Sequence, residues 1–308
     1  MRRHRRWTGL PATDRGASLA IGNFDGVHRG HAAVIEAARR PGLTLGALTF
    51  EPHPREYFRP DAPPFRLMNA EARANRLAKL GVEVLFELPF DARLAGLSAE
   101  AFAREVLAEG LGAAHVAVGA DFRFGKDRGG DAEGLHALGT SLGLDVTVAP
   151  LVAGEGGRIS SSAIRTALAE GRPRDAAAML GHWHRIDGAV LHGDKRGRSL
   201  GYPTANMSLA GLHLPKFGVY AVLVDVLSGP HRGSHIGAAS LGIRPMFETP
   251  TPALETFLFD FAGDLYDAHL SVGLVEFLRP EMRFDSLDAL VAQMEADCAR
   301  ARAVLAAL

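Results

Sequence analysis

The sequence predicts two folded parts in order: an α/β domain with a parallel sheet and helices on both faces, then a small antiparallel β-barrel followed by a C-terminal helix. Up to about Gly181, segments typical of strands and of helices alternate strictly. From His184 onward, short β-rich segments are separated by Gly and Pro turns. With 308 residues, the chain is long enough for two domains with cores of their own. We therefore expect domains at residues 1–181 and 182–308.

The first part is predicted from its apolar segments, which follow either a β pattern or a helical one. The expected strands are residues 18–24, 43–50, 82–88, 113–122 and 144–152. The expected helices are residues 30–40, 69–81, 98–111, 132–143, 160–171 and 172–181. Ser98 is expected to cap the amphipathic helix that follows it, because its hydroxyl can accept a free backbone N–H.

The second part is predicted from five β-rich segments and one long helical pattern. The expected strands are residues 185–193, 218–229, 234–243, 253–261 and 269–278. Residues 286–308 follow a helical pattern, with Ser286 as the expected N-cap. The single cysteine, Cys298, falls within this helix and is expected to be structural. Because it is alone, an intrachain disulfide and a cysteine-built zinc site are excluded.

The composition excludes several classes of function. Hydrophobic residues make up 47% of the chain and charged residues 22%, values ordinary for a soluble globular protein. A net charge of −1 gives no general attraction to nucleic acid or to membranes. The basic start, MRRHRRWTGL, lacks the apolar core of a signal peptide, and no apolar stretch is long enough to cross a bilayer. We expect a cytoplasmic protein whose first residues form a solvated, frayed tail.

The stretch GNFDGVHRGH, residues 22–31, carries the first candidate site. It follows the first expected strand and enters the first expected helix, where a helix N-terminus offers free N–H groups to phosphate. His28 and His31 could donate hydrogen bonds to phosphate oxygens, and the glycines beside them allow close approach of the backbone. The alternatives are a zinc site with His53 and chance surface histidines. The chain has no Walker A loop, and no GxGxxG follows the first strand.

Two motifs in the right order resemble those of the nucleotidyltransferase superfamily: HxGH at His28 and His31, and Ser/Thr-x-x-Arg at Ser162 and Arg165. Four further strings resemble the FMN adenylyltransferase domain of bacterial bifunctional riboflavin kinase/FAD synthetases. These are TFEPHP (49–54), FRL (65–67), GADFRFGKDRGGD (119–131) and RISSSAIR (158–165). The resemblance covers nearly the whole chain. It implies a Rossmann-like first domain in which the FMN phosphate attacks the α-phosphate of ATP and pyrophosphate leaves.

The resemblance also implies roles for individual side chains. The catalytic donors that would stabilise charge on the transferred group are His28, His31, Ser162 and Arg165. The candidates for the ATP side at the strand end are Asn23 and Asp25. The candidates for the flavin side are Phe50, His53, Pro54, Asp121 and Phe122. Core packing is the alternative for the two phenylalanines, and turn formation in an Asp-Gly pair is the alternative for Asp25.

A second candidate site begins in HGDKRGRSLGYPTANM, residues 192–207. Its basic, glycine-rich first half could cover the phosphates of a nucleotide, and a basic hairpin turn is the alternative. The phosphate-binding candidates there are Gly193, Lys195, Arg198 and Gly201. Thr204 and Asn206 are two apart, so in an extended segment they face the same side and could share Mg²⁺ with phosphates. The string resembles the PTAN motif of riboflavin kinases, which implies a six-stranded antiparallel barrel.

The string ALETFLFDFAGDLYD, residues 253–267, resembles the strand that carries a glutamate as general base in the same family. Glu255 is the matching residue. By that resemblance it takes the proton from the ribityl 5′-hydroxyl as this oxygen attacks the γ-phosphate of ATP. A solvent-facing strand position is the alternative. The departures from the family pattern are Met246, Ser240, Phe257 and Ala163, which stand where Thr, Asn, His and Arg are common. Of these, Met246 is the one expected to affect kinase efficiency.

We therefore expect one chain to perform two Mg²⁺-dependent steps with ATP, riboflavin to FMN in the barrel and FMN to FAD in the α/β domain. The expected ligands are riboflavin, FMN, FAD and ATP, without nucleic acid or membrane, and weak self-association is left open. One alternative is an enzyme that adenylylates or cytidylylates another acceptor, such as nicotinate mononucleotide or phosphopantetheine, but such an enzyme would not need the PTAN loop and Glu255. The other is a flavin-binding protein with decayed sites, against which the intact motif residues argue.

Overall fold

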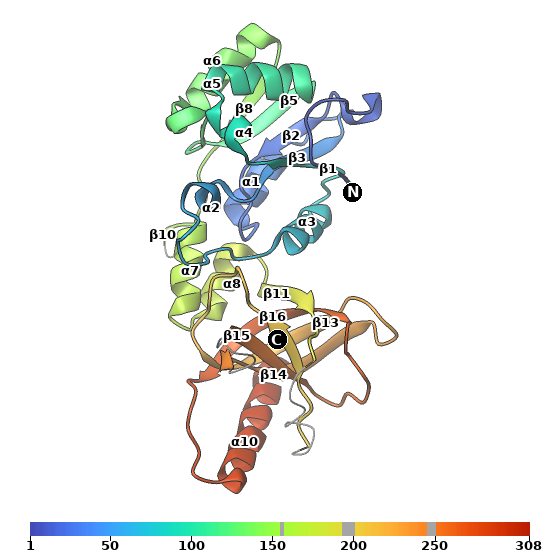
Figure 1. Cartoon of the computed structure of the whole chain (residues 1–308), viewed down its shortest axis with the longest axis vertical. Helices are drawn as coiled ribbons and strands as arrows, with labels where there is room; N and C mark the ends of the chain where they lie inside the picture. The colour runs from blue at the N-terminus through green and yellow to red at the C-terminus, as the bar shows by residue number, and fades with distance from the viewer. Residues whose placement is uncertain (155–156, 193–200, 245–250) are drawn as a thin grey trace. The chain divides into compact units, whose positions relative to one another are not determined.

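The computed structural model describes residues 1–154, 157–192, 201–244 and 251–308 (Figure 1). The chain divides into two compact units. The first unit comprises residues 1–63 and 73–160, and the second comprises residues 64–72 and 161–308. Residues 161–181 thus pack within the second unit, and the domain boundary at 181/182 stays a prediction.

The sheet of the first unit has six strands, and all neighbouring strands are parallel. Their spatial order is β1 (Arg2–His4), β4 (Val84–Pro89), β3 (Leu45–Glu51), β2 (Ser18–Ile21), β5 (His115–Gly119) and β8 (Asp145–Ala149). The order runs one way from β2 through β3 to β4, and the other way from β2 through β5 to β8. The topological switch therefore lies between β2 and β5. In open α/β sheets, ligands bind beyond the carboxyl ends of the strands at such a switch.

Helical segments connect these strands. They are α1 (Arg29–Ala37), α2 (Pro54–Phe58), α3 (Ala70–Lys79), α4 (Ala92–Gly96), α5 (Ala99–Ala101), η2 (Phe102–Gly110) and α6 (Ala132–Leu142), with the short turns η1 (Ala12–Asp14) and η3 (Lys126–Arg128). The small hairpins are β6 (Arg123–Phe124) with β7 (Gly130–Asp131) and β9 (Ala153–Gly154) with β10 (Gly157–Arg158). Ser98 caps α5 by accepting the Ala101 N–H at 3.1 Å, as predicted. The helix expected over 98–111 changes from α to π geometry at Phe102.

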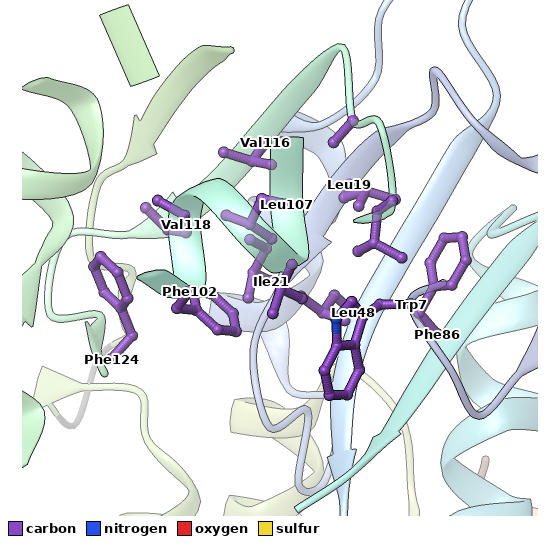
Figure 2. Packing of buried hydrophobic residues seen from close by; sticks show 14 of the residues in the cluster. Trp7, Leu19, Ile21, Leu48, Phe86, Phe102, Leu107, Val116, Val118 and Phe124 are labelled. Carbon is purple, nitrogen blue, oxygen red and sulfur yellow. The ribbon is translucent and has the colours of Figure 1, made fainter. Parts of the chain in front are cut away.

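The main core of the first unit lies on one face of its sheet (Figure 2). Leu19 and Ile21 of β2 belong to the same buried cluster as Phe102 of η2. Side chains alternate along a strand, so Ser18 points to the opposite face. There its hydroxyl donates to the carbonyl of Ala38, at the end of α1. Helices therefore cover both faces of a parallel sheet, and the predicted fold of this part is confirmed.

The first residues do not form a frayed tail, and that expectation is wrong. Arg2–His4 form β1, which pairs with β4 at the edge of the sheet. Arg3 Nη2 lies 2.7 Å from Glu87 Oε2, and Arg2 Nε lies 2.5 Å from Asp14 Oδ1. Both acidic residues are only 2% exposed. A buried carboxylate without a partner is strongly destabilising, so the arginines are held in place.

The second unit is built on a six-stranded antiparallel barrel, as predicted. Its strand order is β11 (His184–Ala189), β16 (His269–Arg279), β13 (Gly218–Val226), β14 (Gly233–Arg244), β15 (Thr251–Leu258) and β12 (Ala205–Ser208). The two edges meet through an antiparallel bridge in which the Leu191 N–H donates to the Asn206 carbonyl at 2.8 Å. Among its described residues, the helices of this unit are α7 (Ser161–Ala169), α8 (Pro173–Leu180) and α10 (Leu287–Ala306). Ser286 caps α10 by accepting the Ala289 N–H at 3.1 Å, as predicted.

His184, at the start of β11, makes the stability of the second unit depend on pH. The residue is 3% exposed, and its burial, together with the nearby His182 and His213, lowers its pKa to about 3. The unfolded chain takes up the proton near pH 6.5 and the folded chain does not. The free energy of unfolding therefore falls as the pH drops from about 6.5 towards 3, and the effect is absent above this range. At pH 5 this side chain should cost about 2 kcal/mol relative to pH 7.5.

Urea unfolding at pH 7.5 and pH 5 measures this loss. The chain has two tryptophans, Trp7 in the first unit and Trp183 in the second. In a Trp7→Phe background, tryptophan fluorescence therefore reports on the second unit alone. The loss of unfolding free energy at pH 5 should be smaller by about 2 kcal/mol in His184→Leu. An equal loss with and without the histidine would contradict the assignment.

Candidate functional sites

The loop after β2, residues 22–28, is held in one conformation before α1 begins. Phe24 and Val27 have positive φ angles of 52° and 43°. Their side chains are buried, with 0% and 1% of each residue exposed, which offsets a backbone conformation that such residues rarely adopt. Thr49 Oγ1 donates to the carbonyl of Asn23 at 3.2 Å and ties the loop to β3. The polar side chains of this loop are thus placed by the fold itself.

His28 and His31 form a reciprocal cap at the N-terminus of α1. The His31 N–H donates to His28 Nδ1 at 3.2 Å, and the His28 N–H donates to His31 Nδ1 at 3.3 Å. The rings stack, with centroids 3.6 Å apart and 10° between their planes. Because both Nδ1 atoms accept, each neutral ring carries its proton on Nε2. Burial and the neighbouring His28 lower the pKa of His31 well below its ordinary value, so this ring is neutral at pH 7.

The histidine pair stands at the carboxyl end of β2, beside the topological switch. Two Nε2 donors and the free N–H groups of a helix N-terminus make this a place that suits phosphate. Asn23 and Asp25 lie on the same loop, the first exposed and the second buried. Asn23, Asp25 and His28 thus lie on the loop after β2, and His31 lies in the first turn of α1 that follows it.

The residues predicted for the flavin side follow β3 and β5. Phe50 is 9% exposed, and its ring contacts Phe90 and Phe102 in the core. His53 and Pro54 begin α2, where His53 is the N-cap. Phe50 thus belongs to the buried core, whereas His53 and Pro54 are partly exposed.

Asp121 and Phe122 lie directly after β5. Asp121 forms an ion pair with Arg158. Phe122 is half-buried and stacks on Phe124, with ring centroids 5.4 Å apart and 13° between the planes. Since β5 is the neighbour of β2 at the switch, these residues occupy the expected position for ligand contact.

The sequence pattern does not single out two aromatic residues that the structure exposes on α2. Tyr57 is 37% exposed and Phe58 is 64% exposed. Their ring centroids lie 5.4 Å and 5.7 Å from that of Phe90. The only signal in the sequence is the pair of adjacent aromatics in REYF, residues 55–58. Because α2 follows the carboxyl end of β3, these large exposed rings are further candidates for stacking on a planar ligand.

Ser162 and Arg165 lie on α7, in the second unit. Ser162 is exposed in the first turn of the helix. Arg165 Nε donates to the Phe65 carbonyl at 2.6 Å, and its guanidinium carbon lies 5.0 Å from the centroid of the Phe65 ring. The FRL string, residues 65–67, and the Ser-x-x-Arg motif are thus in direct contact although they are far apart in sequence.

In the barrel, three polar side chains lie in register across three strands. Asn206 of β12 is the cross-strand partner of Glu255 of β15, and Glu255 is the partner of Ser240 of β14. Directly opposite residues of antiparallel strands place their side chains on the same face, with Cβ atoms about 5 Å apart. Met207 and Leu254, which alternate with this row, are buried in the barrel core. The row therefore lies on the outer face of the barrel.

Thr204 lies two residues before Asn206, immediately before β12 begins at Ala205. The Thr204 hydroxyl and the Asn206 amide oxygen are hard oxygen donors, the kind of ligand that Mg²⁺ prefers. These residues fit such an ion. Within the ranges that the structure describes, no group of three or more His, Cys, Asp or Glu side chains could hold a metal ion. The zinc alternative at the histidine loop gains no support from this.

The basic half of the second motif is mostly outside the described residues. The structure does not describe Gly193, Lys195, Arg198 or Met246. It does describe Gly201, which is exposed. Of the other departures from the family pattern, Phe257 contacts Tyr202, with ring centroids 5.1 Å apart, and packs at the edge of the apolar cluster beneath α10. Ala163 is partly exposed on α7.

Two protein-family models match the chain in succession. The model described as FAD synthetase matches residues 10–163, which include both histidines of the capping pair. The model described as riboflavin kinase matches residues 180–305, which include Asn206 and Glu255. The bifunctional riboflavin kinase/FMN adenylyltransferase of Pseudomonas fluorescens is 44% identical over 297 residues, 95% of this chain and 94% of its own. The chain belongs to the bifunctional riboflavin kinase/FMN adenylyltransferase family.

A second relative carries the same name, and a solved structure with a different title is similar in fold. The bifunctional riboflavin kinase/FMN adenylyltransferase of Escherichia coli K12 is 42% identical and covers 94% of this chain and 93% of its own. A solved structure titled macrolide-efflux protein from Streptococcus pneumoniae has a TM-score of 0.81 and 32% identity, and covers 96% of both chains. The chain is thus an enzyme of FAD biosynthesis that uses ATP as a co-substrate.

Over the described residues, none of the helices has the length and apolar character that a membrane span requires.

Proposed function

We propose that the two activities of this family are carried by two separate sets of side chains in the chain. By their motifs, His28, His31, Ser162 and Arg165 serve the adenylylation of FMN. Riboflavin is phosphorylated at the outer face of the barrel, next to Asn206 and Glu255. The observation that carries the proposal is the direct pairing of Asn206 with Glu255, which joins two motifs of one family on one surface.

Adenylyl transfer needs no covalent nucleophile from the protein. An oxygen of the FMN phosphate attacks the α-phosphate of ATP, a new P–O bond forms, and the bond to pyrophosphate breaks. His28 and His31 donate from Nε2 to phosphate oxygens without needing to be charged. Arg165 adds a fixed positive charge, and Ser162 adds a hydroxyl donor. Donors that are held in place where charge develops lower the barrier by stabilising the transition state.

Riboflavin phosphorylation needs a base for the attacking hydroxyl. Glu255 accepts the proton of the ribityl 5′-hydroxyl while that oxygen forms a bond to the γ-phosphate of ATP and ADP leaves. Thr204 and Asn206 would hold Mg²⁺, which when bound would supply positive charge to the phosphates.

The remaining assignments follow the family resemblance. The residues proposed to contact ATP and its phosphates are Asn23, Asp25, Gly193, Lys195, Arg198 and Gly201. The residues proposed for the flavin side are Phe50, His53, Pro54, Asp121 and Phe122, with Tyr57 and Phe58 as additions. The proposed domains are residues 1–181 and 182–308. Because both steps consume ATP, the proposal places the chain in the cytoplasm, with small molecules rather than nucleic acid or membranes as its ligands.

The geometry of the histidine pair makes Gly30 important for adenylyl transfer. A Cβ atom at Gly30 would lie 3.1 Å from both Cε1 and Nδ1 of His28. In Gly30→Ala the His28 ring must move, and misplaced catalytic groups can cost up to about 10²-fold in rate. We expect FMN adenylylation to fall by about tenfold to a hundredfold and riboflavin phosphorylation to stay unchanged.

Steady-state assays of both activities measure this effect. Gly143→Ala is not a suitable control because Gly143 has a φ angle of +67°. Gly96→Ala is suitable, because a Cβ atom added there would meet nothing within 4 Å and no positive φ is involved. Equal adenylylation rates in Gly30→Ala and in Gly96→Ala would contradict the role given to His28.

The identity of the by-product tests the proposed pair of reactions. Riboflavin with ATP should release ADP, and FMN with ATP should release pyrophosphate. Excess EDTA should stop both reactions, and added Mg²⁺ should restore them. Faster pyrophosphate release with nicotinate mononucleotide or phosphopantetheine than with FMN would favour the alternative acceptors. Flavin binding without either by-product would favour a non-enzymatic flavin-binding protein.

A further inference from the structure

His213 joins two segments that carry adenylyltransferase motifs. Its backbone N–H donates to the Arg66 carbonyl at 2.7 Å. Its side-chain Nε2 lies 3.0 Å from the Arg165 carbonyl in α7. A carbonyl oxygen only accepts, so Nε2 carries the proton and donates. Arg165 in turn donates to the Phe65 carbonyl at 2.6 Å. Three hydrogen bonds thus connect residues 65–66, Arg165 and His213.

The same part of the barrel holds α7 at a second point. The Lys216 N–H donates to the Leu168 carbonyl at 2.9 Å, three residues beyond Arg165 on the helix. On its other side, α7 packs through Ile164 and Leu168 into a buried cluster that includes Leu67. All these residues lie in the second unit. The hydrogen bonds from residues 213 and 216 and the apolar packing of its other residues therefore hold α7, and with it Arg165, in place.

By sequence, His213 belongs to the riboflavin kinase part of the chain. His213 falls within the riboflavin kinase match, residues 180–305. Arg165 falls within neither match, since the FAD synthetase match ends at residue 163. His213 is half-buried, and burial lowers its pKa, so its ring is neutral at pH 7. It is not one of the paired residues of β12, β14 and β15 that carry Asn206, Ser240 and Glu255.

We propose that His213 is a positioning residue for FMN adenylylation, contributed by the riboflavin kinase part of the chain. By donating to the Arg165 carbonyl and to the Arg66 carbonyl, it fixes the arginine against Phe65 in the orientation that the transferred phosphate requires. The inference rests on the proposed role of Arg165. It extends that role by making the adenylyltransferase site depend on a residue of the barrel.

Three substitutions in the full-length chain separate positioning from folding. His213→Gln places an amide N–H close to the position of Nε2 and should keep the bond. His213→Asn places its N–H close to the position of Nδ1, too short to reach the carbonyl, and His213→Leu has no donor. In the Asn and Leu variants, kcat/KM for FMN adenylylation should fall by about tenfold, the size expected for one lost hydrogen bond, and the Gln variant should stay within about threefold of the wild type.

Riboflavin kinase activity of the same samples is the control for folding, because His213 lies in that part of the chain. It should remain within about twofold of the wild type in all three variants, since none of them alters the row of Asn206 and Glu255. Equal adenylylation in the Leu variant and the wild type would overturn the proposal. A parallel loss of both activities, or equal losses in the Gln and Leu variants, would also overturn it in favour of a merely structural role. Failure of the wild-type chain to convert FMN to FAD would instead refute the proposed function.

Discussion

Replacing Glu255 with glutamine should slow riboflavin phosphorylation by about 10²–10⁴-fold, the usual contribution of a positioned general base. Glutamine has nearly the same shape and keeps its place opposite Asn206 and Ser240, but it cannot take the proton from the attacking hydroxyl. FMN adenylylation should be unchanged, because no step of that reaction is assigned to the outer face of the barrel. The measurement is the rate of FMN formation from riboflavin, followed by the rate of FAD formation from supplied FMN.

Glu276→Gln provides a matched control on another strand of the same barrel. Glu276 lies on β16 and forms an ion pair with Arg174 of α8. This is a partly exposed pair, so its loss should change stability by less than about 1 kcal/mol and leave both activities intact. If Glu255→Gln retained kinase activity comparable to that of Glu276→Gln, Glu255 would not be the base.

Removing the imidazoles of the HxGH motif without removing the helix cap should cause a large loss of FMN adenylylation, the second largest effect that we expect. Asparagine is among the best N-cap residues, and at either position its Oδ1 can replace Nδ1 as the acceptor of the capping N–H. In His28→Asn and in His31→Asn the cap therefore remains, while no N–H donor is left at the position of Nε2. We expect each substitution to lower kcat for FMN adenylylation by about 10²–10³-fold, as for the loss of one donor to a developing charge.

The kinase activity of these variants should be unchanged, and their thermal unfolding midpoints should stay close to that of the wild type. His136→Gln is the matched control, because His136 is exposed on α6. Variants that unfold earlier but, once folded, adenylylate FMN at the wild-type rate would show that the two histidines serve only as a cap. A loss of catalysis in stable protein is the result that supports their role as donors.

The fold was largely predictable because its signals are local. Alternating strand and helix patterns predict a parallel sheet, and Ser98 and Ser286 mark helix starts with side chains that the structure shows accepting the expected N–H groups. The N-terminal strand was not predictable, because its residues are charged and its stability comes from distant partners. Glu87 is 84 positions away from Arg3 in sequence, and no local pattern reveals that pairing.

The motifs of the two candidate sites were predictable from the sequence, but the contacts and strand pairings between their residues were not. HxGH places two histidines three residues apart, so their neighbourhood at a helix start follows from the sequence. The pairing of Asn206 with Glu255 depends on the register of β12 against β15, which the sequence does not encode locally. The contact of His213 with Arg165 depends on how α7 packs within the second unit, and a single half-buried histidine carries no signal of its own.

The central claim is that one chain carries out both steps, and a chromatographic time course tests it most directly. The purified chain is incubated with riboflavin, ATP and Mg²⁺, and the flavins are separated at intervals. The account predicts that FMN appears first and FAD later, and that supplied FMN is converted to FAD without a lag. FAD from supplied FMN with no FMN from riboflavin would contradict the kinase assignment, and no flavin product from either substrate would contradict both.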